Sequence, residues 1–279
     1  MSAHLSWNLV DDVRQLLQFP FMVNALRAGT IVAIVAGAIG YFMVLRRESF
    51  AGHTLALIGF PGAAGATWLG VNESLGFFGF CVAGALVIAI VPAGRSSERS
   101  AVIGTVQAFA LACGLLFVSL YHGYLTGLND LLFGTIIGIS KTQVWILLVA
   151  GGAALAVLAV IARPLLFASI DADVARARGV RVRLVGALFL VLLGVAAAGT
   201  SQVTGTLLVF ALLVAPAATA VRLTTSPLAG VTLSVVIAIV VTWLGEGAAY
   251  FSPYPIGFWV TTFAFGLFLL ASGYRRFLC

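Results

Sequence analysis

Long uncharged stretches, separated by short loops that often carry arginine, make up almost the whole of this chain. All but one of them are close to or above the length of about 20 apolar residues that a helix needs to cross a lipid bilayer. The pattern therefore predicts an all-α, polytopic transmembrane helical bundle with eight to nine spans. The uncharged stretches are residues 28–45, 49–72, 74–94, 100–129, 131–140, 142–162, 184–221, 223–245 and 247–274.

One of these stretches is long enough for two spans, and another is too short for any. Stretch 184–221 has 38 residues, which is enough for two passes joined by a tight turn near Ser201 and Gln202. Stretch 131–140 is too short to cross the bilayer and is better explained as a re-entrant or interfacial segment. Nine spans follow from this division, and eight remain if one short span is only half inserted.

The composition excludes a soluble domain, because 62% of the residues are hydrophobic and only 9% are charged. Basic loops stay on the cytoplasmic side of a membrane. Placing the N-terminus outside puts all but three of the 15 basic residues inside, the exceptions being Arg14, Arg27 and Lys141. The net charge of +6 follows from this asymmetry and requires no nucleic-acid partner.

The chain divides into residues 1–20 and residues 21–279. The first part contains Asp11, Asp12 and Arg14 and lacks the continuous apolar core of a cleavable signal peptide. Its apolar residues fall roughly on one face of a short helix, which predicts an N-terminal interfacial segment. Residues 21–279 are expected to form the transmembrane domain.

Small residues and a proline give stretch 49–72 an unusual composition for a span. Gly59, Gly62 and Gly65 form a smooth face that another backbone can approach closely. Pro61 leaves a carbonyl one turn earlier without its helical donor. Two interpretations remain open: tight packing at the centre of a bundle, or an interrupted helix that lines a transport pathway.

Few ionisable side chains lie within the predicted spans, and burying one in lipid is costly enough to suggest function. His53 lies close to the cytoplasmic end of its span, where it either contacts a transported ion or is a structural histidine that reaches water. Glu246 lies near the outer end of its span and is expected at a water-facing rim, with a metal contact as the second interpretation. The uncharged polar residues at membrane depth are Asn24, Gln107 and Gln202.

No arrangement of residues indicates an enzyme. The three histidines and nine acidic residues are scattered over different loops, and the three cysteines lack paired spacing. The nucleotide-binding pattern G-x-x-x-x-G-K-[ST] is absent, and the only lysine, Lys141, follows a serine. Any ATP must therefore be bound by another subunit.

One long charged loop, about residues 164–183, lies on the predicted cytoplasmic side. Pro164 can begin a helix, Asp171 can cap the next one, and Gly179 can end it. The short helix in between carries small apolar residues among arginines. Such a helix suits either docking of a soluble partner or binding to anionic lipid.

Five stretches of the chain carry its most specific patterns, and they are Tyr41–Gly52, Phe60–Ala64, Leu131–Ser140, Asp171–Val180 and Gly205–Ala220. In this order they resemble the ABC-3 family, the permease subunits of ABC importers for zinc, manganese and iron. Phe60-Pro61-Gly62-Ala63-Ala64, for example, is similar to the family's Leu-Pro-Gly-Val-Ala. The resemblance covers about residues 24 to 270, and its most specific match is Gly205–Ala220.

The resemblance implies a type II ABC importer permease fold in the bacterial cytoplasmic (inner) membrane, most often as a homodimer. It implies cytoplasmic ATPase subunits and a periplasmic or lipid-anchored metal-binding protein as partners. The metal is cargo, and no permanently bound cofactor is expected. The residues that the resemblance assigns to ATPase coupling are Asp171, Ala175, Arg178 and Gly179. The residues that the composition of stretch 49–72 marks for packing along the pathway are Gly59, Pro61, Gly62 and Gly65.

Two departures from the family pattern bear on the metal. Where the family usually has Gly-Asp-x-x-x-His, this chain has Gly52 and His53 and then Leu57. The family's Asp-x-Pro-x-Gly appears as Pro253–Gly257 without its acid. Because an imidazole without carboxylates suits zinc better than manganese, and because the turn resembles the zinc-specific branch, we expect zinc. Manganese or iron transport by the same family, or a secondary transporter without ATPase, are the alternatives.

Overall fold

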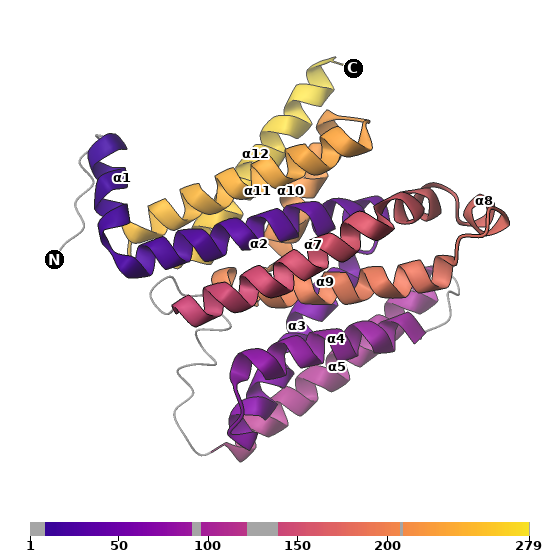
Figure 1. The fold of residues 1–279 in the computed structure, drawn as a ribbon, viewed down its shortest axis with the longest axis horizontal. Coiled ribbons are helices and arrows are strands. Elements are labelled where there is room, and N and C mark those ends of the chain that lie inside the picture. Colours follow the sequence, from indigo (N-terminus) through magenta and orange to yellow (C-terminus); the bar gives the residue numbers. More distant parts are fainter. Residues whose placement is uncertain (1–8, 91–95, 122–138, 207–208, 279) are drawn as a thin grey trace.

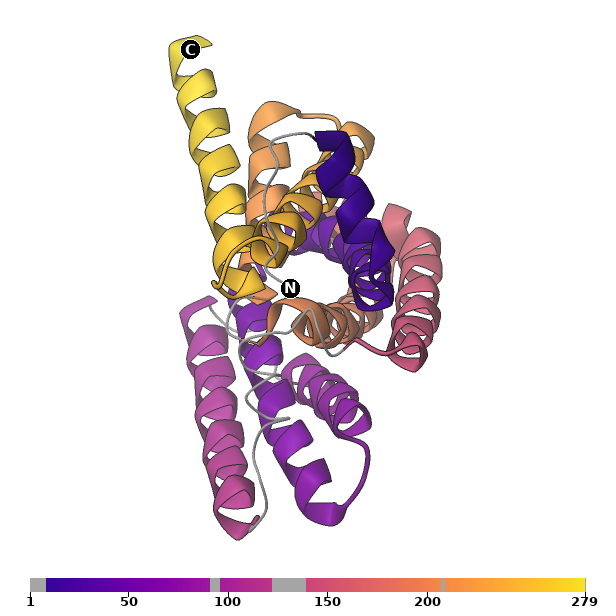
Figure 2. The ribbon, with the colours of Figure 1, turned by 90° about the vertical axis from the view of Figure 1, so that its left-hand side faces the viewer.

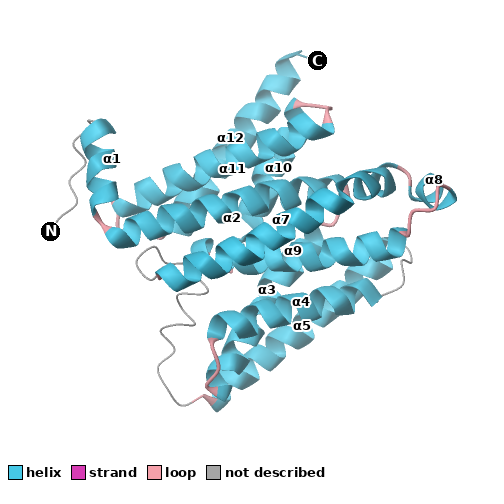
Figure 3. Cartoon of the chain, in the orientation of Figure 1, coloured by secondary structure: helices cyan, strands magenta, loops and turns pink. Residues whose placement is uncertain are grey.

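Helices make up the described part of this computed structural model, which comprises residues 9–90, 96–121, 139–206 and 209–278 (Figure 1). No strand occurs among these residues (Figure 3). The all-α prediction is therefore confirmed for them. The helices are α1 (Leu9–Gln18), α2 (Pro20–Leu45), α3 (Ser49–Leu69), α4 (Glu73–Ile90), α5 (Ser96–Leu120), α7 (Lys141–Ile170), α8 (Ala172–Ala177), α9 (Val182–Thr204), α10 (Val209–Leu223), α11 (Pro227–Tyr250) and α12 (Ile256–Leu278).

Seven of the described helices are long and apolar enough to cross a membrane, namely α2, α4, α5, α7, α9, α11 and α12. α10 is apolar but has only 15 residues. α3 has 21 residues and contains His53, Pro61 and several glycines, and it is not among the seven. The count of eight to nine spans is therefore not confirmed. Residues 131–138 lie outside the described residues, so a re-entrant form of stretch 131–140 stays a prediction.

The turn within stretch 184–221 comes later than predicted. Ser201 and Gln202 both belong to α9, and the Ser201 hydroxyl is already bonded to a helix carbonyl. The chain turns at Gly205, whose φ of +80° is open to glycine and strained for other residues. The predicted division of this stretch into two helices is confirmed, but the turn lies at Gly205 instead of beside Ser201 and Gln202, because the polar side chains of these two residues are accommodated within α9.

α2 is the centre of the bundle. α7, α9, α10 and α11 pack around it, and α12 packs against α10 and α11 (Figure 1). α3, α4 and α5 form a second group, which joins the first largely through α9 (Figure 2). α8 projects from one end of the bundle, and α1 lies at the opposite end (Figure 1).

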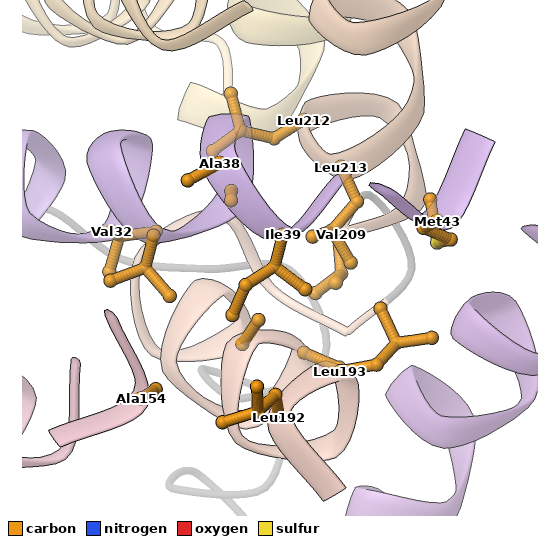
Figure 4. Close-up of a cluster of buried hydrophobic side chains, with 14 of the residues drawn as sticks. Val32, Ala38, Ile39, Met43, Ala154, Leu192, Leu193, Val209, Leu212 and Leu213 are labelled. Carbon is orange, nitrogen blue, oxygen red and sulfur yellow. The ribbon is translucent and has the colours of Figure 1, made fainter. Parts of the chain in front are cut away.

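The core lies where α2, α9 and α10 meet (Figure 4). Ile39, Leu193 and Leu213, one from each helix, are fully buried. On the other side of α2, Ser234 of α11 donates a hydrogen bond to the Gly37 carbonyl at 2.7 Å. Lipid offers no hydrophobic drive for helix association, so close packing and hydrogen bonds of this kind hold such a bundle together.

Candidate functional site

His53 lies one turn into α3, on the face of that helix that is only partly buried. Its ring meets the ring of Phe210 in α10 edge to face, with the centroids 5.3 Å apart. Within the described part of the chain, His53 makes no hydrogen bond or ion pair. Leu57 and Phe60, one and two turns later, share this partly buried face. This face of α3 therefore presents one ligand-capable side chain beside two apolar ones.

The opposite face of α3 packs tightly against two neighbouring helices. A Cβ added at Gly59 would overlap the Phe77 ring of α4, and one at Gly62 would overlap a backbone carbonyl of α4. At Gly65, a Cβ would lie 3.2 Å from the Phe117 ring of α5. These contacts support the packing interpretation of the glycines. That α3 also lines a transport pathway stays a prediction.

Pro61 does not interrupt α3, which runs unbroken from Ser49 to Leu69. A Cβ on Gly114 of α5 would lie 3.2 Å from Pro61, so the two helices meet closely at this point. Because proline has no N–H, the carbonyl of Leu57 lacks its usual helical donor. α3 is thus a continuous helix in which the Leu57 carbonyl, one turn beyond His53, lacks its helical hydrogen bond.

Two of the polar residues predicted at membrane depth form links between helices. Thr54 Oγ1 donates to Gln107 Oε1 at 2.8 Å and ties α3 to α5. Gln202 Oε1 accepts from Ser74 Oγ at 3.2 Å and from Gln143 Nε2, which ties α9 to α4 and α7. Such bonds stabilise helix pairs in lipid. No local sequence pattern identifies these partners, because each lies on a different helix.

Glu246 lies wholly inside the bundle. Its exposed fraction is 0%, and neither carboxyl oxygen has a hydrogen-bond partner among the described residues. Gly29 of α2 provides the space, since a Cβ there would overlap Glu246 Oε1. The prediction of a water-facing rim was wrong, because a glycine far away in the sequence lets α2 cover this side chain. A buried carboxyl group without partners is uncommon and costly in its ionised form.

His53 and Glu246 do not belong to one site. His53 lies near the start of α3 against α10, whereas Glu246 lies near the end of α11 against α2. In the part of the chain that the structure describes, no three His, Cys, Asp or Glu side chains gather where they could hold a metal ion. A single protomer therefore offers no complete ligand set among these residues.

The predicted coupling loop begins later than its sequence indicates. α7 continues through Pro164 to Ile170, so the prediction that Pro164 begins a helix was wrong. Leu165 is fully buried and anchors this end of α7, and the helix tolerates the one backbone hydrogen bond that proline removes.

α8 is closed at both ends by its own residues. Asp171 Oδ1 accepts hydrogen bonds from two N–H groups of the first turn, at 2.9 and 3.0 Å, as an N-cap. Gly179 has a φ of +83°, and the N–H of Val180 returns to the Ala175 carbonyl at 3.0 Å. This is the glycine-terminated end that helices commonly use. The predicted cap and stop are confirmed.

The two faces of α8 differ in exposure. Ala175 is fully buried against the bundle, whereas Arg176 and Arg178 are exposed. Arg176 pairs with Asp173 at 2.6 Å. α8 therefore combines an apolar anchor with a basic surface at the end of the molecule. Its role in coupling to an ATPase stays a prediction from these positions.

Comparison with known proteins places this arrangement in a family. The sequence profile described as the ABC 3 transport family matches residues 18–275. The chain is 32% identical over 212 residues to the manganese import system permease protein ScaB of Streptococcus parasanguinis, which covers 76% of this chain and 75% of that protein. It is 31% identical over 217 residues to the manganese transport system membrane protein MntC of Halalkalibacterium halodurans, covering 78% of this chain and 74% of that protein.

The fold is also similar to that of a solved structure. PsaBC from Streptococcus pneumoniae in complex with Fab matches with a TM-score of 0.84 and 29% identity, over 94% of this chain and 95% of the matched chain. The family match and the helical bundle agree with each other over almost the whole chain. The chain therefore belongs to the ABC 3 transport family, as a multi-pass permease subunit of a metal ABC transporter in the bacterial inner membrane, and is not itself an enzyme.

Proposed function

We propose that this chain is the permease of an importer for a divalent transition metal, with manganese as its cargo. We choose manganese because both relatives described above are named as manganese transport proteins. Zinc is the second candidate, for one reason: His53 stands where the family pattern has a carboxylate, and imidazole suits zinc better than manganese.

His53 is the side chain that we propose to meet the ion. It is the one ligand-capable side chain on the partly exposed face of α3 formed with Leu57 and Phe60. The Leu57 carbonyl, which Pro61 deprives of its helical donor, adds an oxygen of the kind that manganese accepts. A site with so few ligands binds weakly, and weak binding suits a pathway that the ion must also leave. Glu246, with its unpartnered carboxyl group, is the further candidate contact.

A second protomer completes the pathway in this proposal. The face of α3 that carries His53 adjoins Phe210 of α10, and a groove of about 280 Å³ between α10 and α12 continues this surface past Ala215 and Phe265. A two-fold dimer brings the same surface of both copies together. Two His53 side chains would then reach one pathway, which makes up for the incomplete ligand set of a single chain.

Two partners supply what this chain lacks. A cytoplasmic ATPase is proposed to bind α8, because α8 projects from the bundle, is capped at both ends and presents exposed arginines. Its buried Ala175 would pass a displacement of α8 to the bundle. A periplasmic or lipid-anchored binding protein is proposed to deliver the metal at the opposite end.

Uptake of radioactive manganese and zinc tests this function. The chain is expressed, together with an ATPase and a binding protein encoded beside it, in cells that lack their own manganese and zinc importers. We expect manganese uptake, and we expect His53→Ala to slow it about tenfold or more, which corresponds to about 1.4 kcal/mol. Leu57→Ala is the matched control, because it shortens a side chain on the same face without removing a ligand.

Three outcomes would contradict parts of the proposal. Uptake of zinc alone would overturn the choice of metal. A His53→Ala permease as fast as the parent, at equal protein level, would remove His53 from the pathway. Uptake that persists without the ATPase, or with residues 171–179 replaced by a glycine–serine stretch, would overturn coupling to the ATPase through α8, and the first of these results would also indicate a secondary transporter.

A further inference from the structure

A groove of about 640 Å³ opens on the side of the bundle between α1, α2, α7 and α11. Most of its lining residues come from α1 and from the first turns of α2 and α7, and Figure 1 shows that these segments lie at the end of the molecule opposite α8. In the orientation that the arginines indicate, this is the outer end. The groove is remote from α8 and from the face of α3 that carries His53, so the proposed transport function does not account for it.

Basic side chains gather at this groove although basic residues are rare on the outer side. Arg27 and Lys141 both line it and both are exposed. Neither side chain makes an ion pair or hydrogen bond within the described residues. None of the described residues that line the groove is acidic. Arg14, the third basic residue placed outside, is exposed on α1 one turn from Leu17, which also lines the groove.

Two tryptophans give the groove the character of a membrane interface. Trp145 is 65% exposed and Trp243 is 51% exposed, and both line the groove. Trp243 Nε1 donates to Thr30 Oγ1 at 2.9 Å, which fixes its ring against α2. At a rise of about 1.5 Å per residue, Arg27 and Trp243 lie about 10 Å from the outer ends of their helices. Tryptophan is enriched where membrane helices meet lipid headgroups, and a long arginine side chain can extend its charge outward to that level.

We propose that this groove binds an anionic phospholipid of the outer leaflet, with its phosphate held by Arg27 and Lys141. The rest of the lining is largely apolar and runs along the helices past Ile31, Val144 and Leu148, which suits acyl chains. Basic pockets between transmembrane helices on the cytoplasmic side bind anionic headgroups, and the same attraction between opposite charges acts in an outer-leaflet groove.

Two other occupants fit the groove less well. A second copy of this chain docking here by two-fold symmetry would set Arg27 and Lys141 against the same residues of its partner, which is unfavourable. An acidic surface of the binding protein would complement the charges. It would approach from the aqueous side, however, and would leave the apolar wall that faces the membrane uncovered.

Native mass spectrometry of the purified permease–ATPase complex tests the proposal, with phosphatidylglycerol compared with zwitterionic phosphatidylcholine. We expect phosphatidylglycerol to bind more tightly. The double variant Arg27→Gln/Lys141→Gln should weaken its binding at least about tenfold, while the charge-preserving control Arg27→Lys/Lys141→Arg keeps it. Glycerophosphoglycerol, the headgroup without acyl chains, should not compete. The elution volume and unfolding temperature of both variants show that the complex is intact.

Several results would overturn the lipid assignment. One is equal binding of both lipids to the parent complex, and another is unchanged phosphatidylglycerol binding by an intact glutamine variant. Effective competition by glycerophosphoglycerol would assign the groove to a soluble phosphate ester. Loss of binding-protein association by the glutamine variant, with lipid binding unchanged, would assign the basic cluster to that protein.

Discussion

The interior of the bundle and helix α8 are held by different kinds of contact. Inside the bundle, α3 packs against α4 at Gly59 and Gly62, and α2 packs against α11 at Gly29. These contacts depend on the absence of a side chain at each glycine, because a Cβ there would overlap the neighbouring helix. α8 is closed by the side chain of Asp171 and the backbone of Gly179, both acting on groups a few residues away. Added side-chain volume should therefore destabilise the interior of the bundle, whereas loss of a single capping hydrogen bond should be enough to destabilise α8.

The difference follows from the surroundings of the two regions. Helices in lipid gain little from burying apolar side chains against each other, so their association depends on close approach and interhelical hydrogen bonds. α8 lies at the end of the bundle with exposed arginines, and a helix of six residues there needs its caps. Three substitutions test this contrast, and they are Gly62→Leu, Glu246→Gln and Asp171→Ala.

We expect Gly62→Leu to have the largest effect. The new side chain would meet a carbonyl of α4 and the side chain of Phe80. Backbone cannot move aside without disturbing the fold, and overpacking costs about 1–3 kcal/mol or more. The yield and unfolding temperature of the detergent-purified permease measure the loss. Gly79→Leu is the matched control, because a Cβ at this exposed glycine of α4 meets nothing within 4 Å. Equal losses for both variants would show that the contact at Gly62 is not the cause.

Glu246→Gln should have an intermediate effect of the opposite sign. The amide nearly keeps the shape of the side chain but cannot ionise, so it removes the cost of a buried carboxylate without partners, about 1 kcal/mol or more. We expect a higher unfolding temperature. Because Glu246 is also a candidate ion contact, we expect slower metal uptake by the same variant.

The control for this variant is Glu98→Gln, at an exposed position in the first turn of α5. It should leave unfolding temperature and uptake unchanged. A less stable Glu246→Gln permease would mean that the carboxyl group has a stabilising partner after all. A more stable variant with full uptake would restrict Glu246 to packing against Gly29.

Asp171→Ala should have the smallest effect on stability and a visible effect on function. Loss of an N-cap costs about 1 kcal/mol, and this cost falls on α8 alone. The unfolding temperature of the bundle should hardly change, whereas ATP-driven uptake should fall severalfold. Asp173→Ala is the matched control, since Asp173 is exposed and bonds to Arg176 instead of serving as the cap. An equal fall in uptake with Asp173→Ala would show that charge matters more than the cap.

Much of the helical pattern could be predicted from the sequence, and the errors have a common origin. Uncharged stretches mark most of the helices, because length and hydropathy are properties of adjacent residues. Charged residues and prolines predict helix boundaries, and that rule fails at Glu246 and Pro164. Both residues lie inside helices, where packing by Gly29 and burial of Leu165 outweigh the local preference.

An all-α membrane protein could be predicted from the sequence alone. So could an α8 that begins after Asp171 and ends before Gly179, because these features depend on neighbouring residues. The burial of Glu246 against Gly29 and the contact of His53 with Phe210 could be found only in the folded bundle. These pairs lie on helices far apart in the chain. Their contact depends on how whole helices pack, and no pattern within a single stretch records that packing.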